Sequence, residues 1–260
     1  GRLCVGIDPH PHLLEAWGLS VDVDGLRTFT LRCVEAFAET AAVVKPQVAF
    51  FERFGSRGFA VLEEALAGLR EQGCLSLADA KRGDIGSTMA GYAQAWLGED
   101  SPLRSDAVTV SPYLGVGALS PVFDLAEDTG RGVFVLAATS NPEAVALQSL
   151  SVDGRSVAQR VVDELAQRNA SAAGSDNTVG ALGVVVGATL EAPPALDQLN
   201  GPVLLPGVGA QGATPADVRQ LTAAAPKLGF ANVSRAILSQ GPNASELRKA
   251  VVDTVAEFRD

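Results

Sequence analysis

Three charged side chains lie close together where an apolar segment of the chain ends, and they could perform proton chemistry. Asp79 and Lys81 are two residues apart, so both project from the same face of a β-strand, and Asp84 follows three residues later. An amine between two carboxylates keeps its charge, because each anion favours the protonated form. Lys81 is therefore predicted to be a proton donor. The alternative interpretation is a cluster of surface salt bridges at a strand end.

The residues around this trio predict a strand that turns sharply into a helix. Cys74 to Ala78 is apolar and is typical of a buried strand. Gly83 and Gly86 allow a tight backbone turn, and Ser87 and Thr88 are suited to the start of a helix. The charged side chains are thus expected at the junction of a strand and a helix.

Composition and charge argue against several classes of protein. Of the 260 residues 47% are hydrophobic, yet no run of about 18 uncharged apolar residues occurs, and the N-terminus lacks the basic-then-apolar order of a signal peptide. We expect a soluble, cytoplasmic protein that does not bind membranes. The three cysteines lie far apart in apolar surroundings, which favours free thiols over disulfides or zinc. The net charge of -10 argues against general nucleic-acid binding.

Eight short apolar runs recur along the chain, most of them separated by a segment long enough for a helix. The runs are continuously hydrophobic, which suits strands buried on both faces of a parallel sheet. Eight repeats of strand and helix are typical of a (β/α)₈ TIM barrel of the α/β class, here a single domain over residues 1–260. A doubly wound open sheet is the competing arrangement, because alternation alone does not establish closure.

The predicted strands and helices follow each other closely in sequence. The strands are Leu3 to Asp8, Ala42 to Ala49, Cys74 to Asp79, Asp106 to Ser111, Gly132 to Ala138, Leu182 to Gly187, Pro202 to Pro206 and Leu228 to Val233. The helices are Val23 to Ala38, Gly58 to Gln72, Ser87 to Leu97, Val116 to Asp128, Arg155 to Ala170, Thr214 to Ala225 and Asn243 to Phe258. In the sixth connection, Pro193 and Pro194 leave room for only a short helix near Ala195 to Leu199. The chain begins almost on its first strand, and we expect a short leading segment to precede it.

The carboxyl ends of the strands are where a barrel builds its active site, and polar residues gather there in this sequence. Asp8 ends the first run, and Lys45 lies inside the second, where a lysine requires a charged partner. The loop from Pro206 to Gln211 is rich in glycine and can bring backbone amides to a phosphate. Arg235, after the eighth run, can bind phosphate oxygens through its two-pronged guanidinium. We predict a phosphate site at strands seven and eight.

His10 and His12 are interpreted as residues of a solvated loop. No cysteine and no cluster of carboxylates accompanies them, apart from Asp8, so the pair lacks the ligand set of a metal site. We predict no bound metal.

Taken together, these residues resemble the orotidine 5'-phosphate decarboxylase family, and the resemblance extends from the first strand to the last. Its most specific element is Asp79-Ala-Lys81-Arg-Gly-Asp84-Ile85, with Thr88 behind it, which is similar to the bacterial subgroup that includes actinobacterial enzymes. The other matching positions occur in the same order, namely Asp8, Lys45, Ser140-Asn-Pro142, Pro206-Gly-Val-Gly-Ala-Gln211 and Arg235.

The resemblance implies decarboxylation of orotidine 5'-monophosphate to uridine 5'-monophosphate, the last step of de novo pyrimidine synthesis, without metal or organic cofactor. It implies that Lys81 protonates C6 of the pyrimidine, within an alternating charge array of Lys45, Asp79, Lys81 and Asp84. It further implies a homodimer with shared sites, because Asp84, Ile85 and Thr88 would reach the site of the partner subunit. The resemblance also implies the substrate contacts. Asp8 and Lys45 would bind the ribose, with a further contact from Thr88 across the dimer, and Ser140 would contact the base. The phosphate would be bound by Gln211, Arg235, the backbone of Ser234 and the loop that begins at Pro206.

Two alternatives share part of this pattern. The 3-keto-gulonate phosphate decarboxylases and hexulose phosphate synthases of the same superfamily have Asp-x-Lys-x-x-Asp but use magnesium, held partly by a glutamate on the second strand. Lys45 stands on that strand here, and its charge would repel the metal. The other alternative is a non-catalytic phosphate-binding barrel, which would be expected to lack a member of the charge array.

Overall fold

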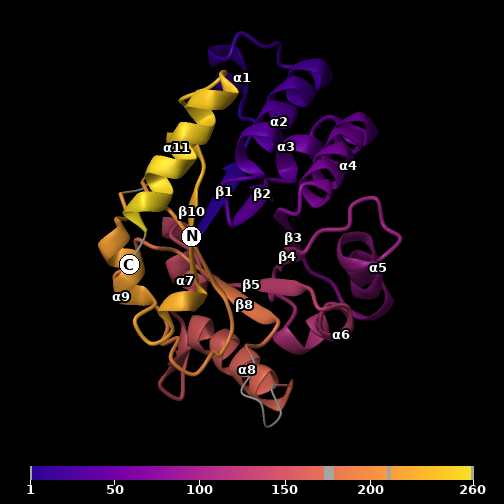
Figure 1. The fold of residues 1–260 in the computed structure, drawn as a ribbon. Helices are drawn as coiled ribbons and strands as arrows, with labels where there is room; N and C mark the ends of the chain where they lie inside the picture. Colours follow the sequence, from indigo (N-terminus) through magenta and orange to yellow (C-terminus); the bar gives the residue numbers. More distant parts are fainter. Residues whose placement is uncertain (1, 173–178, 210–211, 259–260) are drawn as a thin grey trace.

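Eight parallel strands close into a barrel in the computed structural model, which describes residues 2–172, 179–209 and 212–258 (Figure 1). Their order around the barrel is β1-β10-β9-β8-β5-β4-β3-β2. The strands are β1 (Leu3–Ile7), β2 (Val43–Pro46), β3 (Leu75–Arg82), β4 (Ala107–Val110), β5 (Gly132–Ala138), β8 (Leu182–Val186), β9 (Val203–Pro206) and β10 (Gly229–Val233). Val5 of β1 pairs with Val44 of β2 on one side and with Val233 of β10 on the other. The predicted barrel is confirmed, and the open sheet is excluded.

Burial on both faces explains why the strands are continuously hydrophobic. In β1 the side chain of Cys4 belongs to a small apolar cluster with Leu77, Phe134 and Leu204 from other strands of the barrel. Its neighbours Leu3, Val5 and Ile7 belong instead to the large cluster that includes the surrounding helices. Each residue of the strand therefore leaves water, whichever face it occupies.

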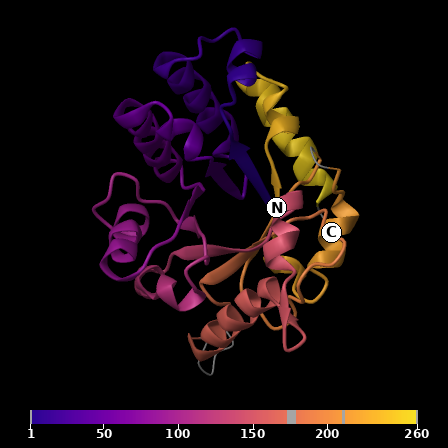
Figure 2. The same cartoon turned by 180° about the vertical axis from the view of Figure 1, so that it is seen from behind.

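Helices surround the barrel, as the view from behind also shows (Figure 2). They are α1 (Pro11–Ala16), α2 (Val23–Phe37), α3 (Ala49–Glu52), α4 (Gly55–Glu71), α5 (Gly86–Leu97), α6 (Ser120–Thr129), α7 (Val145–Gln148), α8 (Val157–Ala172), α9 (Pro215–Leu221), α10 (Arg235–Leu238) and α11 (Ala244–Glu257), with the 3₁₀ turns η1 (Val116–Leu119), η2 (Pro142–Ala144) and η4 (Pro226–Leu228). The last helix lies beside α2, where Arg248 donates a hydrogen bond to the carbonyl of Glu35 at 3.1 Å. No helix within the described ranges is long and apolar enough to cross a membrane.

Several connections differ from the sequence prediction, and the predicted strand from Ala42 to Ala49 ends at Pro46, with Ala49 beginning α3. The expected helix near Ala195 to Leu199 does not form, and the backbone there makes only a turn at Asp197 and Gln198. The expected helix from Val116 is divided into η1 and α6, because Pro121 suits the first turn of a new helix. Arg155, expected in a helix, pairs with Val152 in a hairpin of β6 (Ser151–Val152) and β7 (Arg155–Ser156).

The hairpin turn has a sequence signal that the helical periodicity obscured. Asp153 and Gly154 have φ values of 54° and 76°, the positive values that a two-residue hairpin turn requires at both central positions. Asp-Gly is a favoured pair for such a turn. The periodic apolar pattern of α8 begins directly after the hairpin, so the pattern alone predicts that the helix includes Arg155.

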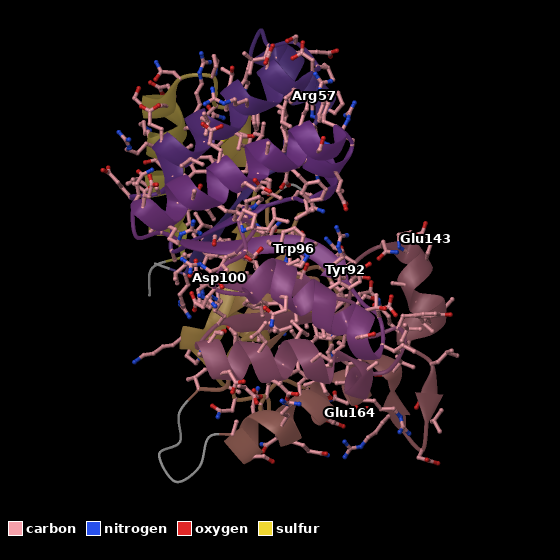
Figure 3. All side chains as sticks on the ribbon, turned by 90° about the vertical axis from the view of Figure 1, so that its right-hand side faces the viewer. Arg57, Tyr92, Trp96, Asp100, Glu143 and Glu164 are labelled. Carbon is pink, nitrogen blue, oxygen red and sulfur yellow. The ribbon has the colours of Figure 1, made fainter. Side chains whose placement is uncertain are left out.

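Arg82, the last residue of β3, connects the barrel to two helices. Its guanidinium lies 5.7 Å from the ring centre of Tyr92 and 5.8 Å from that of Trp96, both on α5. Figure 3 shows these two rings on the helix that faces the viewer. Arg82 also forms an ion pair with Glu52 of α3. The end of β3, which carries Asp79 and Lys81, is thereby held to α5 and to α3.

Candidate active site

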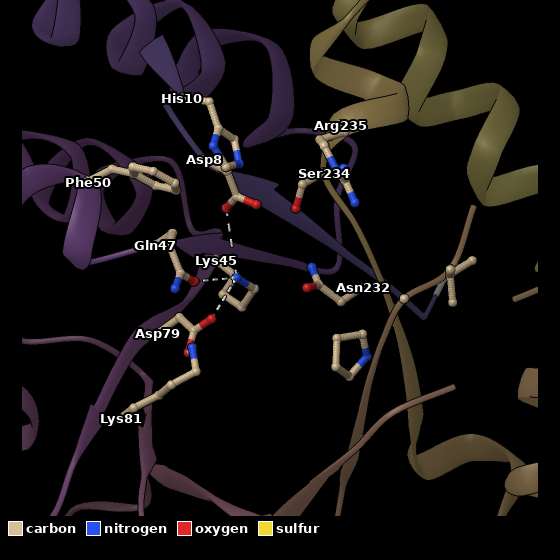
Figure 4. Close-up of a pocket in the computed structure, with 13 residues that line it drawn as sticks. Asp8, His10, Lys45, Gln47, Phe50, Asp79, Lys81, Asn232, Ser234 and Arg235 are labelled. Carbon is tan, nitrogen blue, oxygen red and sulfur yellow. Dashed lines mark hydrogen bonds and ion pairs between the residues drawn. The ribbon is translucent and has the colours of Figure 1, made fainter. Parts of the chain in front are cut away.

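A cavity of about 290 Å³ opens where β1, β2, β3, β9 and β10 end (Figure 4). Because the strands are parallel, their carboxyl ends meet at one face of the barrel. The cavity is lined by Asp8, His10, Lys45, Gln47, Phe50, Asp79, Lys81, Pro206, Gly207, Val208, Asn232, Ser234 and Arg235. Most residues predicted from the strand ends are therefore brought together by the fold.

The carboxylate of Asp79 lies between two ammonium groups. Its Oδ1 is 2.6 Å from Nζ of Lys81, and its Oδ2 is 3.0 Å from Nζ of Lys45. The spacing along the chain predicts the reverse, with Lys81 between Asp79 and Asp84. Instead Asp84 accepts a hydrogen bond from the backbone N–H of Ile85 at 2.8 Å, and across the part of the chain described it forms no ion pair with Lys81. The turn at Gly83 carries Asp84 beyond the end of the strand.

Lys45 has the charged partners that its position in an apolar strand requires. The residue is only 3% exposed, and its Nζ also contacts Oε1 of Gln47 at 3.2 Å and Oδ1 of Asp8 at 3.9 Å. Burial would lower the pKa of Lys45, but the carboxylates of Asp79 and Asp8 outweigh it and raise the pKa above its ordinary value. Lys45 is therefore a permanent cation.

Asp79 is a permanent anion for the complementary reason. Burial would raise the pKa of its carboxyl group, but the ammonium groups of Lys45 and Lys81 outweigh it and hold the pKa well below its usual range. The side chain of Lys81 differs from both, because it is 44% exposed and faces the cavity. The array thus has a buried cation, a buried anion and one accessible ammonium.

Asp8 has an oxygen that is ready to accept a hydrogen bond. Its Oδ1 is shielded from solvent, and none of the described residues donates a hydrogen bond to it. A buried acceptor without a donor is unfavourable, and a hydroxyl group bound in the cavity would correct this.

The opposite wall is built from the ends of β9 and β10. Pro206 is followed by Gly207, whose φ of 101° lies in the region that favours glycine. A Cβ atom on Gly6 would lie 1.9 Å from Oγ of Ser234, so this glycine makes room for the serine. Arg235 is exposed at the rim, and its guanidinium has no ion pair or hydrogen bond with the residues the structure describes. Gln211, predicted to bind phosphate, lies outside the described residues.

Besides Asp84, three predicted site residues within the described ranges do not line the cavity. Ile85 precedes α5 with 61% of its surface exposed, and Thr88 is exposed in the first turn of that helix. Ser140 follows β5 and is half-buried, next to Gly187, where a Cβ atom would approach Ser140 within 3.0 Å.

Four residues of the cavity wall were missed by the sequence analysis. Gln47 and Asn232 could have been found, because each is two residues from a predicted site residue, Lys45 and Ser234, and so shares its side of the chain. His10 lies in a half-buried loop, as expected, but it also lines the cavity, which the sequence analysis did not foresee. Its backbone N–H donates to the carbonyl of Asp8 at 2.7 Å, and the folded loop places the imidazole over the cavity, 4.3 Å from the ring centre of Phe50.

Comparison with known proteins gives consistent matches over nearly the whole chain. Residues 1–250 match the model of the orotidine 5'-phosphate decarboxylase / HUMPS family. The chain is 64% identical over 259 residues to the orotidine 5'-phosphate decarboxylase of Corynebacterium efficiens, covering 99% of this chain and 92% of that protein.

Solved structures agree with the sequence matches. A crystal structure from Streptomyces avermitilis superposes with a TM-score of 0.93 at 54% identity, covering 100% of this chain and 90% of that one. The structure of Leishmania donovani OMP decarboxylase has a TM-score of 0.77 at 31% identity, covering 99% and 92%.

Proposed function

Since the chain belongs to the orotidine 5'-phosphate decarboxylase / HUMPS family, we propose that its 260 residues form a single catalytic domain that decarboxylates orotidine 5'-monophosphate to uridine 5'-monophosphate. The observation that carries this proposal is the accessible ammonium of Lys81, held at 2.6 Å by a carboxylate whose other oxygen is paired with buried Lys45. The reaction would be the last step of de novo pyrimidine synthesis.

The chemistry places an unusual demand on the protein. When the bond between C6 and the carboxylate breaks, carbon dioxide leaves and the electron pair stays on C6, in an orbital orthogonal to the pyrimidine π system. Resonance therefore gives little stabilisation, and electrostatics must supply it. In our proposal the ammonium of Lys81 stabilises this developing anion and then transfers a proton from Nζ to C6. Lys81 regains a proton from solvent after the product leaves.

One ion pair is not sufficient for this task. At roughly 4 Å and an effective dielectric constant near 20, the attraction is about 4 kcal/mol before desolvation. Enzymes commonly lower barriers by ~8 to ~23 kcal/mol, and the upper end applies to the slowest reactions. Binding energy from the remote phosphate, used to order the site, is the natural supplement.

The cavity wall supports a division of the substrate contacts. Asp8 and Lys45 are proposed to bind the ribose hydroxyls, and the shielded Oδ1 of Asp8, to which no described residue donates a hydrogen bond, supports this role. The phosphate is proposed to be bound by Arg235, by Gln211, by the backbone of Ser234 and by the loop that begins at Pro206. Ser140 is proposed to contact the base. The volume of about 290 Å³ is close to the lower end of small-molecule sites.

We further propose a homodimer with shared active sites. Among the described residues of its own chain Lys81 has one carboxylate partner, whereas the proposed array requires Asp84 as a second. Asp84, Ile85 and Thr88 follow the strand end and do not line the cavity of their own subunit, which supports their reaching the cavity of a second copy. Each site would then be incomplete in a monomer.

The surface around these residues has the apolar character of an interface. Ile85 is 61% exposed, and in the loop after β4, Tyr113 and Leu114 are 78% and 54% exposed. The two segments are adjacent, because the backbone N–H of Ser111 donates to the carbonyl of Arg82 at 2.7 Å. Large exposed apolar side chains on neighbouring loops mark interaction sites more often than single ones do.

The reaction is proposed to need no metal. In the magnesium-dependent alternative, a second-strand carboxylate helps to hold the metal, but here the buried ammonium of Lys45 occupies that strand and would repel a divalent cation. The relatives support the decarboxylase and not this alternative. The three cysteines are free and buried, which supports a reducing, cytoplasmic location.

An ultraviolet assay of orotidine 5'-monophosphate, run with and without a chelator, tests the proposal. We expect loss of substrate at the same rate in both reactions. Inhibition by the chelator that magnesium reverses would favour the magnesium-dependent alternative. Binding of uridine 5'-monophosphate without any turnover of substrate would favour the non-catalytic barrel.

A further inference from the structure

A buried threonine on β4 contacts both residues at the centre of the charge array. Thr109 is 1% exposed, and its hydroxyl donates a hydrogen bond to Oδ1 of Asp79 at 2.9 Å. The hydroxyl oxygen of Thr109 in turn accepts a hydrogen bond from the backbone N–H of Lys81 at 3.0 Å. A hydroxyl has one proton and two lone pairs, so it can make both bonds at once.

The backbone at this point is irregular. Ala78 of β3 pairs with Val108 of β4, but the next pair is Arg82 with Val110, so the register shifts between them. Thr109 is the one residue of β4 that faces the three intervening residues of β3. Lys81 lies in this bulge with a φ of 48°, a left-handed conformation that is unfavourable for a residue with a side chain.

The bulge removes the regular backbone partner of the Lys81 N–H, and the hydroxyl of Thr109 replaces it. We propose that Thr109 is a positioning residue, which holds Lys81 in its left-handed conformation and Asp79 in the rotamer that receives the ammonium. This inference rests on the proposed function, because the position of Lys81 matters only if Lys81 is the proton donor. Thr109 itself does not line the cavity.

The side chain of threonine is suited to this role. Its branched Cβ restricts rotation about χ1, so the hydroxyl is held in one direction. Without the hydroxyl, the N–H of Lys81 would be buried without an acceptor, and rotation of the backbone toward an extended conformation would relieve the strain. The ammonium of Lys81 would then move away from Oδ1 of Asp79 and from the position at which it can reach C6 of the substrate.

Two substitutions separate the hydroxyl from the methyl group. Thr109→Val keeps the shape but removes both hydrogen bonds, and Thr109→Ser keeps the hydroxyl. Thr222→Val is the matched control, because Thr222 is also buried and donates at 2.8 Å to the carbonyl of Val218, on α9 and away from the cavity. For each variant, kcat and KM for orotidine 5'-monophosphate, the Kd for uridine 5'-monophosphate and the Tm would be measured.

We expect Thr109→Val to lower kcat by about 10- to 100-fold, with KM and the product Kd changed less than about threefold, since no binding group moves. Thr109→Ser should keep kcat within about threefold of the unmodified protein, and Thr222→Val should lower only the Tm. If Thr109→Val does not fold, Thr109→Ala replaces it. The alanine variant should then show the same loss of kcat relative to Thr109→Ser.

Three results would overturn the inference: an unchanged kcat in Thr109→Val, equal losses of kcat in the valine and serine variants, or a change confined to KM. These results are distinct from failure of the proposed function, in which the unmodified protein itself would not decarboxylate orotidine 5'-monophosphate.

Discussion

The ammonium of Lys81 lies 2.6 Å from Oδ1 of Asp79, a carboxylate two residues earlier on the same strand. The two side chains differ in their access to solvent: that of Lys81 is 44% exposed, whereas that of Asp79 is 11% exposed. The anion is therefore anchored in the barrel, and the cation extends from it into the cavity. This arrangement directs a charged donor to a ligand without leaving the charge unpaired in the free protein.

Replacement of Lys81 should separate turnover from binding. Lys81→Ala removes the proposed proton donor and the charge that stabilises the C6 anion, so kcat should fall by on the order of 10³-fold or more. The phosphate and ribose contacts remain, and titration calorimetry with uridine 5'-monophosphate should still detect binding. Lys249→Ala is the matched control, because Lys249 forms an ion pair of the same length, 2.6 Å to Asp253, on α11. Appreciable residual decarboxylation would contradict the role of Lys81 as donor.

Shared active sites predict complementation between two inactive variants. Lys81→Ala and Asp84→Ala should each be inactive alone. In a heterodimer of the two, one site would contain both substitutions and the other neither. Co-refolding of equal amounts should therefore restore about a quarter of the unmodified activity, since half of the dimers would be mixed.

The activity of the mixture would be assayed before and after co-refolding, together with the mass of the assembly by light scattering. Two Lys81→Ala preparations that differ only in an affinity tag provide the control, because no combination of their subunits contains an intact site. A mixed dimer that forms but stays inactive would count against shared sites.

Arg235 should be important only for substrates with a phosphate. Arg235→Ala removes a bidentate contact, so kcat/KM for orotidine 5'-monophosphate should fall by on the order of 10²-fold or more. For the nucleoside orotidine, which lacks the phosphate, the variant and the unmodified protein should react equally slowly. Arg219→Ala, on α9, is a suitable control for general loss of positive charge. An equal effect of Arg235→Ala on both substrates would refute a phosphate contact.

The buried thiols predict a loss of stability in alkaline solution. Burial raises the pKa of Cys4 from 9.0 to about 12, and that of Cys74 to about 11. The folded state therefore keeps protons that the unfolded chain releases, so this contribution is fully present below pH 9 and is lost as pH rises toward 11 to 12. Each such thiol should lower the free energy of unfolding by about 1.4 kcal/mol per pH unit in this window.

Urea unfolding between about pH 8 and pH 10.5 measures this slope. Cys4→Ala should unfold more easily at every pH, but its stability should decline less steeply above pH 9, because one titrating group has been removed. Ser105→Ala, another buried polar-to-apolar change, should lower stability without changing the slope. An identical slope for Cys4→Ala and the unmodified protein would contradict the assignment.

Local sequence patterns determined most of the fold. Continuous apolar runs predicted all eight strands, because a strand that is buried on both faces carries apolar side chains on both. The carboxyl ends of those strands then identified Asp8, Lys45, Asp79 and Lys81, since parallel strands bring their ends to one face. Alternation along a strand predicted that Asp79 and Lys81 lie close together, although the strand proves irregular at Lys81.

Relations between strands were decided only by the tertiary structure. Closure depends on the pairing of β1 with β10, whose residues are more than two hundred positions apart, and no local pattern encodes it. Likewise the register shift that places Thr109 opposite Asp79 and Lys81 depends on how β3 and β4 align. The position of Asp84 beyond the strand end, and of His10 over the cavity, depends on turns whose direction tertiary contacts select. The sequence specified which groups are charged and which are buried, because these are properties of residues and their periodicity. The fold decided which oxygen each ammonium meets, because hydrogen-bond geometry arises only when distant segments are packed together.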